Sequence, residues 1–273
     1  MTKLVAQIAI VPNGPHIDLA EVTRVSAAIQ KQITRDVCPI WNVNATVDVI
    51  SSLEQVPLGY WPIIIGGEEL PEGALGIHLS DDNQPFALVR NTTGWSLTAS
   101  HECIEMLVDP FGNRLVPGQS PSPNQGRVLF LVEACGPCEG VENGYTVNDI
   151  LMSDFYTPNY FDPKQVSGVR YDYTGNIEAP REVLSGGYLS WKNPQDGQYY
   201  QLQDVDGNEK IVSLGEARPR GCIREVIDHH PLTPKPIRQP MPRETRMLRM
   251  AEEKAWVTGQ ITAHWAQELR RQF

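Results

Sequence analysis

A proline-rich stretch near the C-terminus divides this chain into two unequal parts. Residues 218–242 contain six prolines in 25 positions. Proline removes a backbone donor and cannot continue a helix or a central strand, so we expect an extended connector here. The chain of 273 residues is therefore predicted to comprise a folded body, residues 1–216, a connector, residues 217–242, and a terminal segment, residues 243–273.

The first half of the body has the pattern of a mixed α/β domain. Apolar residues alternate in residues 3–11, 44–51 and 60–65, which predicts three strands. From Asp18 onward they recur every three or four residues, which predicts a helix. Two short apolar runs within 74–89 flank a turn-rich Ser-Asp-Asp-Asn sequence and predict a hairpin.

The second half of the body is predicted to start with a helix and end with a small β-meander. Residues 96–109 have helical spacing and end at an Asp-Pro pair. A loop is expected over 116–126 and a strand over 127–132. Three strands joined by Asp-Gly turns are expected within 186–214.

Composition narrows the class of protein. Residues 217–273 contain 11 Lys and Arg and 6 Asp and Glu, a net charge of about +5. Residues 1–216 contain 12 Lys and Arg and 27 Asp and Glu, a net charge of about −15. An acidic body makes nucleic acid a poor partner for it. No run of 18 apolar residues and no signal peptide is recognised, so we expect no membrane span and a cytoplasmic protein. Five cysteines are too few and odd in number for a disulfide framework.

The helix predicted over 96–109 carries the sharpest chemical motif, His101-Glu102-x-x-Glu105. Residues four apart lie on one helix face, so His101 and Glu105 can hold one metal ion together. Glu102 lies 100° around the helix, where a general base for a metal-bound water is needed.

This motif resembles the active-site helix of the zincin metallopeptidases, H-E-x-x-H. In that superfamily the helix follows a mixed sheet with an edge strand beside the substrate cleft, and residues 1–95 have the corresponding order of elements. The stretch S-H-E-x-x-E-M-L-x-D-P is also similar to stretches in uncharacterised phage and bacterial proteins. The resemblance covers about residues 1–165 and implies a zincin-like fold, a Zn²⁺ site and a cytoplasmic or virion-associated protein.

One residue departs from the family pattern, because Glu105 stands where the second histidine is expected. One imidazole and two carboxylates leave a Zn²⁺ site near zero net charge, whereas two imidazoles and one carboxylate leave it at +1. We therefore expect a higher pKa of the bound water, slower hydrolysis, and tolerance of harder ions such as Mn²⁺.

The third ligand is assigned to Glu133, which ends the first strand after the helix at a separation that glutamate-type zincins use. Glu139 and Asp109 are the alternatives. The stretch from Ile150 to Tyr156 resembles the methionine turn of one zincin branch, in which Met152 would lie beneath the metal. Tyr156 and Tyr160 are then candidates for stabilising an oxyanion. For Met152, an ordinary role in filling the core is preferred over a role beneath a metal.

Two other features are interpreted as structural and not as parts of an active site. Cys135-Gly-Pro-Cys138 has the thioredoxin tetrapeptide, but no helical pattern follows it, so a tight turn is preferred over a redox role or a shared metal site. His78 sits in a strand alternation and is interpreted as structural.

Two functions follow from these observations. The first is a metal-dependent hydrolase of protein or peptide substrates, with His101, Glu105 and Glu133 holding Zn²⁺ or Mn²⁺ and Glu102 as general base. The second is a catalytically weak or inactive zincin-fold subunit of a phage or other assembly. It would dock, or form a homo-oligomer, through 243–273, a segment whose apolar residues recur every three or four positions. A thiol-disulfide enzyme is a third, more distant alternative.

Overall fold

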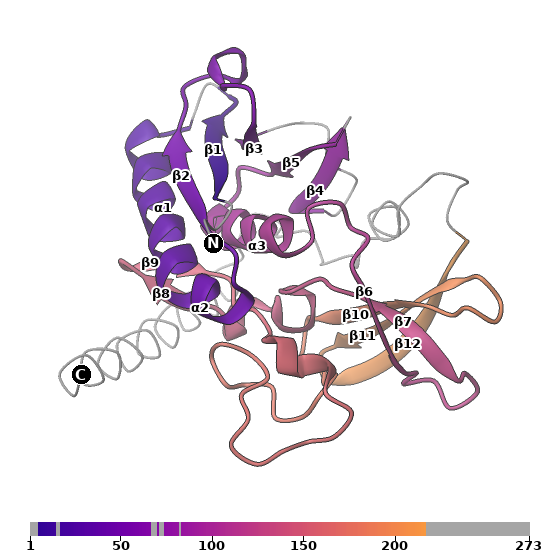
Figure 1. Ribbon diagram of the computed structural model, residues 1–273. Helices are drawn as coiled ribbons and strands as arrows, with labels where there is room; N and C mark the ends of the chain where they lie inside the picture. Colours follow the sequence, from indigo (N-terminus) through magenta and orange to yellow (C-terminus); the bar gives the residue numbers. More distant parts are fainter. Residues whose placement is uncertain (1–4, 15–16, 67–69, 71–73, 82, 217–273) are drawn as a thin grey trace.

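The computed structural model describes residues 5–14, 17–66, 70, 74–81 and 83–216 (Figure 1). The connector 217–242 and the docking segment 243–273 lie outside the described residues, and what was expected of them stays a prediction.

The first half of the chain forms a five-stranded mixed sheet, here called sheet A. Its spatial order is β2-β1-β3-β5-β4. The pairs β1–β2, β1–β3 and β3–β5 are parallel, whereas β4 runs antiparallel to β5 and forms one edge. The strands are β1 (Ala6–Pro12), β2 (Ala45–Val49), β3 (Tyr60–Ile65), β4 (Gly76–Asp81) and β5 (Gln84–Val89).

Helix α1 (Leu19–Gln32) connects β1 to β2 and begins where the sequence predicts. The side chain of Asp18 accepts a hydrogen bond from the Ala20 amide at 3.0 Å and caps the helix. The helix continues into a π-helical turn, Ile33–Val37, and a short helix α2 (Cys38–Trp41). Its apolar side packs on the sheet, since Val22, Val25 and Ile29 are buried.

Helix α3 (Trp95–Val108) lies between two layers of the molecule (Figure 1). It contacts β3, β4 and β5 on one side and β9 (Ile150–Met152) on the other. Its N-cap is Gly94, which lies in the left-handed region with φ 80° and offers no side chain to cap the helix. Its end at Asp109 is as predicted.

The second half forms a five-stranded antiparallel sheet, sheet B, in the order β12-β11-β10-β7-β6. The predicted meander supplies its last three strands. The loop expected over 116–126 is partly wrong, because Leu115–Gln119 pairs with β7 as an edge strand, a position that tolerates Pro117. The strands are β6 (Leu115–Gln119), β7 (Arg127–Leu131), β10 (Tyr188–Lys192), β11 (Tyr199–Val205) and β12 (Asn208–Gly215).

Short elements complete the second half. A two-stranded sheet consists of β8 (Tyr145–Val147) and β9 (Ile150–Met152). Single 3-10 turns are at Leu53–Gln55, Gly136–Cys138, Val141–Asn143 and Pro158–Phe161.

One hydrophobic core connects the two sheets through α3. It includes Ile8 and Ile63 of sheet A, Met106 of α3, and Phe130 and Trp191 of sheet B, each 0 % exposed. The mixed α+β class predicted from the sequence is confirmed. In the described part of the chain, no helix has the length and apolar character needed to cross a membrane.

Candidate metal centre

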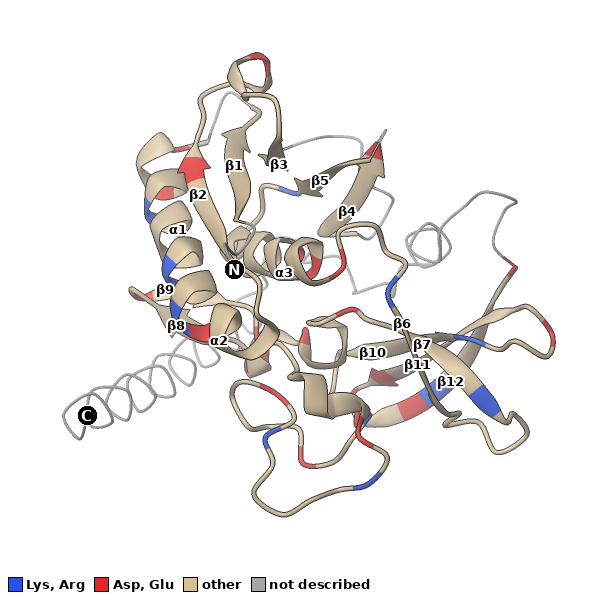
Figure 2. Cartoon of the chain, in the orientation of Figure 1, with Lys and Arg blue, Asp and Glu red and all other residues tan. Residues whose placement is uncertain are grey.

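Three buried side chains from two elements converge beneath the edge of sheet A. His78 comes from β4, and Glu102 and Glu105 come from α3. Figure 2 shows the acidic positions of α3 in red, toward the end of the helix nearer β4. One ligand atom from each lies within 4.8 Å of the other two. Among the described residues this is the one group of three His, Cys, Asp or Glu side chains that could hold a metal ion.

The separations suit a common cation. His78 Nδ1 lies 3.3 Å from Glu102 Oε2 and 3.8 Å from Glu105 Oε2. Ligands that bind Zn²⁺ tetrahedrally at about 2.1 Å lie about 3.4 Å apart from one another. An ion therefore fits among these atoms with small side-chain adjustments.

The second nitrogen of His78 identifies which tautomer is held. His78 Nε2 lies 3.3 Å from the backbone oxygen of Asp109, and a carbonyl oxygen can only accept, so we assign the proton to Nε2. The lone pair of Nδ1 then faces the carboxylates. That contact is repulsive unless an added proton or a cation lies between them. A ligating histidine is commonly held in this way, with its other nitrogen donating to a carbonyl.

The local sequence makes room for this group. Glu102 and Glu105 are three residues apart on α3 and so lie on neighbouring parts of its surface. On β4, Gly76 is two residues before His78 and faces the same side. A Cβ at Gly76 would lie 2.7 Å from Glu102 Oε1 and 2.5 Å from Thr98 Cγ2, so only glycine lets β4 lie this close to the helix.

His101 binds the other side of Glu105. Its Nε2 lies 3.4 Å from Glu105 Oε1, and its side chain is 12 % exposed. Burial lowers the pKa of His101, but Glu105, Glu102 and Glu139 raise it by more, to about 10. His101 of the metal-free protein is therefore an imidazolium paired with Glu105 at neutral pH. The same Oε1 accepts a hydrogen bond from the Cys135 amide at 3.1 Å.

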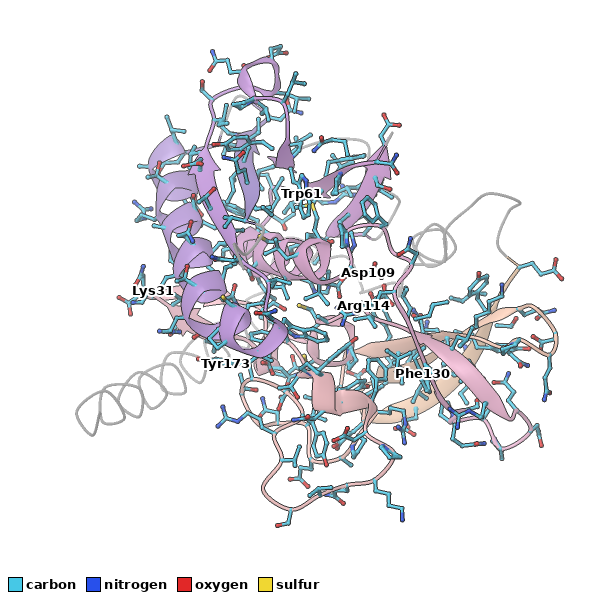
Figure 3. All side chains as sticks on the ribbon, viewed as in Figure 1. Lys31, Trp61, Asp109, Arg114, Phe130 and Tyr173 are labelled. Atoms are coloured by element: carbon cyan, nitrogen blue, oxygen red, sulfur yellow. The ribbon has the colours of Figure 1, made fainter. Side chains whose placement is uncertain are left out.

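The remaining predicted ligands have other contacts. Glu133 accepts hydrogen bonds from the Tyr188 hydroxyl at 3.3 Å and the Ser190 hydroxyl at 3.0 Å, both on β10. Asp109 accepts from the amides of Asn113 and Arg114 at 3.1 and 2.8 Å, and so closes the loop between α3 and β6 (Figure 3). Thus His101 and Glu105 lie beside each other as predicted, but of the predicted ligands only Glu105 belongs to the three-residue group, and His101, Glu133 and Asp109 do not. Glu139 acts on His101 electrostatically.

Tyr156 lies in the core beside the motif. Its ring stacks on Tyr160 with centroids 4.4 Å apart, and its buried hydroxyl has no hydrogen-bond partner among the residues that the structure describes. Burial, followed by Tyr160, Glu105 and Glu133, raises the pKa of Tyr156 well above its usual value. The hydroxyl therefore stays protonated and faces acidic neighbours. Met152 is fully buried in the core.

Cys135 and Cys138 bracket a single 3-10 turn and do not precede a longer helix. Both are buried, and burial raises the pKa of each thiol well above its usual value, with acidic neighbours adding to the effect. These thiols lack the thiolate character that thioredoxin-like chemistry needs.

Sequence reasoning missed His78 as a member of the site. The residue alternates correctly within a strand, which is the ordinary pattern of a structural position. Its role depends on β4 lying across α3, a contact between elements that local spacing does not contain. The available indication was that His78 lies on the strand that would correspond to the edge strand of the sheet in the order of elements found in zincins.

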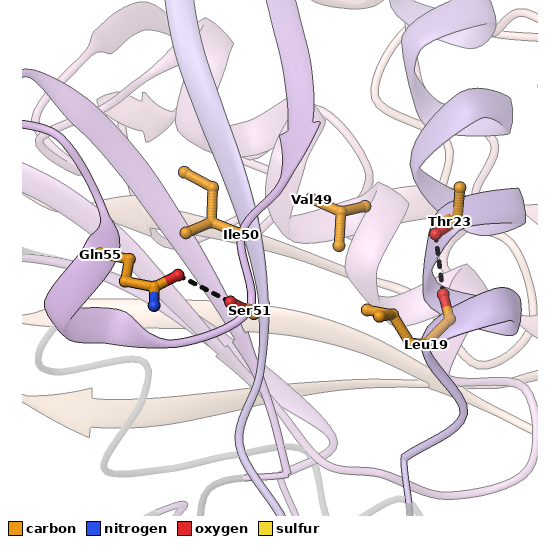
Figure 4. A pocket seen from close by; sticks show the side chains of 6 residues that line it. All are labelled: Leu19, Thr23, Val49, Ile50, Ser51 and Gln55. Carbon is orange, nitrogen blue, oxygen red and sulfur yellow. Dashed lines mark hydrogen bonds between the residues drawn. The ribbon is translucent and has the colours of Figure 1, made fainter.

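A separate hollow of about 410 Å³ lies at the start of α1 and the end of β2 (Figure 4). None of its lining side chains titrates or binds metal well, so this hollow offers no comparable chemistry. The lining residues are Leu19, Thr23, Val49, Ile50, Ser51 and Gln55.

Comparison of the chain with protein-family models, with curated proteins and with solved structures gave no match.

Proposed function

We propose that this protein is a metal-dependent hydrolase, a zinc metallopeptidase of the zincin-like kind, with its metal between β4 and α3. The observation that carries the proposal is the buried group of His78, Glu102 and Glu105, in which Nδ1 of His78 faces two carboxylates. A divalent cation between them would bind the Nδ1 lone pair and balance the two carboxylate charges.

The donor set suggests which ion would bind. One imidazole and two carboxylates suit Zn²⁺ and also harder ions such as Mn²⁺. Two carboxylates neutralise one dication, so the site keeps the near-zero net charge expected of this motif. When bound, such an ion acts as a Lewis acid that lowers the pKa of water and polarises a carbonyl.

The arrangement of elements supports the same proposal. The chain has a strand, a helix, two further strands, an antiparallel edge strand, one more strand and then the motif helix. This is the order that the resemblance to zincins implies, with β4 in the place of the strand beside the substrate cleft. The proposal therefore includes a zincin-like fold for this part of the chain.

His101 has a distinct part in this arrangement. Of the four motif and edge-strand side chains it is the most exposed, at 12 %. Its Nε2 lies against the Glu105 oxygen that does not face His78. His101 is thus placed to move a proton between the site and solvent.

A competing assignment keeps the ligands derived from the motif, which are His101, Glu105 and Glu133, with Glu102 as general base. Metal content of untagged protein, measured by mass spectrometry, separates the two. We expect one equivalent in the unmodified protein, loss of metal in His78→Ala, and retention in His101→Ala. The reverse result would establish the motif-derived ligands, and an absence of metal from all three proteins would exclude both.

Hydrolysis is tested directly with a mixture of quenched fluorescent peptides. Activity should need Zn²⁺ or Mn²⁺, stop on addition of chelator, and be lost in Glu105→Gln. Metal binding without cleavage of any peptide would leave the metal site in place and refute the hydrolase.

The second candidate, a structural subunit of a phage or other assembly, is favoured by one observation. His78, Glu102 and Glu105 are only 2 %, 3 % and 0 % exposed, and closed metal sites are typically structural. For this candidate, metal raises the melting temperature and no peptide is cleaved.

A further inference from the structure

The hollow at the start of α1 has exposed leucine side chains at its border. Leu19 lines the hollow and is 51 % exposed. Leu53 is 50 % exposed and begins the 3-10 turn whose last residue, Gln55, also lines the hollow. Single exposed leucines are ordinary, whereas apolar side chains gathered around a concave surface are typical of a contact site. The hollow's volume of about 410 Å³ lies within the range of clefts that bind ligands, about 300–1,000 Å³.

The lining of the hollow favours an apolar side chain as its occupant. Both hydroxyl groups of the lining are already hydrogen-bonded: Thr23 donates to the Leu19 backbone oxygen at 2.8 Å, and Ser51 donates to Gln55 Oε1 at 2.7 Å (Figure 4). Covering a hydroxyl group that keeps its hydrogen bond avoids the free-energy cost of burying an unsatisfied one. Three of the six lining side chains are aliphatic, and these gain from contact with another apolar group.

The two stretches of chain that form the hollow are acidic. Residues 17–24 and 48–55 carry all of its lining side chains and contain four acidic residues against one basic residue, Arg24. The four acidic side chains are all exposed, and they are Asp18, Glu21, Asp48 and Glu54. Figure 2 shows acidic positions at the end of β2 and in the loop beyond it. The first three accept hydrogen bonds from an amide, an indole and a hydroxyl group. These donors are neutral, so the negative charges are not cancelled.

We propose that this hollow is the docking site for a basic amphipathic segment of a partner protein. A large apolar side chain of the partner enters the hollow, and Lys or Arg residues beside it face the acidic side chains. Complementary charges speed association and discriminate against partners of like charge. The same charges disfavour nucleic acid, whose phosphates would face carboxylates.

The location of the hollow leaves the candidate metal centre open. The hollow lies at the end of β2, and the metal centre lies beside β4, and these two strands are the opposite edges of sheet A. Docking of the partner and binding of metal are therefore compatible, and the docking site does not depend on the proposed hydrolase.

Three synthetic peptides of equal length test the chemistry of the partner. The first has leucine and lysine at helical spacing, the second replaces lysine with glutamate, and the third replaces leucine with serine. We expect the full chain to bind only the first peptide, as measured by fluorescence anisotropy, and severalfold more weakly when salt is raised from about 50 to about 500 mM. The methyl NMR signals of Leu19, Val49 and Ile50 should shift on binding. Equal affinity for either control peptide, or shifts confined to other methyl groups, would overturn the proposal.

Two matched pairs of variants test the site itself. Leu19→Ser should weaken binding of the leucine–lysine peptide by about tenfold, whereas Val166→Ser should not, although Val166 is also 51 % exposed. Glu54→Lys should weaken binding, whereas Glu178→Lys, at an exposed acidic position outside the hollow, should leave it unchanged. Melting curves check that all four proteins remain folded. Equal affinities within either pair would refute this docking site.

The free protein provides a last test of the occupant. Nuclear Overhauser contacts from the Leu19, Val49 or Ile50 methyl groups to Trp256 or Trp265 would show that the chain's own terminal segment fills the hollow. That result would overturn docking of a separate partner. We expect these contacts to be absent, and contacts to the leucines of the bound peptide to be present.

Discussion

The proton on His78 Nε2 decides what this side chain can bind. The hydrogen bond from Nε2 to the Asp109 carbonyl orients the ring so that Nδ1 faces Glu102 and Glu105. The chemistry of the site therefore depends on a contact at the end of α3. The sequence contains all of these residues. It does not show that the end of α3 meets β4, which is why His78 looked like an ordinary strand residue.

Glu102→Gln separates two chemical roles of Glu102. If Glu102 is a ligand beside His78, the neutral amide should release the metal and the stability it contributes, about 2.7 kcal/mol at a metal concentration one hundredfold above Kd. If Glu102 is only the general base, the variant should keep one metal per chain and lose about 10²–10⁴ in turnover. We expect loss of metal, as measured by mass spectrometry and by melting with and without chelator.

Gly76→Ala tests the close approach of β4 to α3. Its added Cβ would overlap Glu102 and Thr98, so we expect destabilisation of about 1–3 kcal/mol and weaker metal binding. The matched control is Gly126→Ala, whose Cβ would meet only the end of the Gln195 side chain, at 3.4 Å. Equal denaturation curves and metal titrations for the two variants would contradict this account.

At the scale of elements, α3 was predictable and β6 was not. A helical period and a terminal Asp-Pro pair are local signals, so residues 96–109 identified α3 to within one residue at each end. Leu115–Gln119 contains Pro117 and Gly118, which locally favour a loop. It becomes a strand through its pairing with β7, whose partner residues lie 8 to 16 positions further along the chain, from Gln119–Arg127 to Leu115–Leu131.

Asp109 links the end of α3 to the loop that follows. Asp109→Ala removes the acceptor for two backbone amides, so we expect a loss of about 1–3 kcal/mol in unfolding free energy. The displaced carbonyl should also release His78 and weaken metal binding. Asp109→Asn keeps one acceptor and should give an intermediate effect in chemical denaturation and metal titration. A metal affinity unchanged in both variants would show that His78 does not depend on this loop.

For the whole molecule, the His101–Glu105 pair predicts the pH dependence of stability without metal. The pKa of His101 is raised from 6.5 to about 10, so the folded state binds the extra proton. The stabilisation is fully present below pH 6.5 and is lost as the pH rises to about 10. Chelator-treated protein should therefore melt progressively lower between these values, and His101→Gln should show a smaller decrease over the same interval.

A second prediction for the whole molecule concerns the C-terminal segment, residues 243–273. Deleting residues 243–273 is expected to leave the body folded, because the proline-rich connector marks a boundary that few contacts should cross. Self-association or partner binding should be lost instead. Melting and light scattering of the truncated protein check both parts, and collapse of the fold would show that the segment belongs to the core.

The position of the candidate ligands along the chain has a consequence for biosynthesis. His78, Glu102 and Glu105 all precede residue 115, where sheet B begins. Sheet A and α3 are therefore complete while the ribosome is still translating the other layer, and domains generally fold from the N-terminus during synthesis. If the proposed site binds metal, the nascent chain would be able to take up the ion before the Cys135 amide is there to bind Glu105, and the ions available during synthesis would then influence which metal is bound.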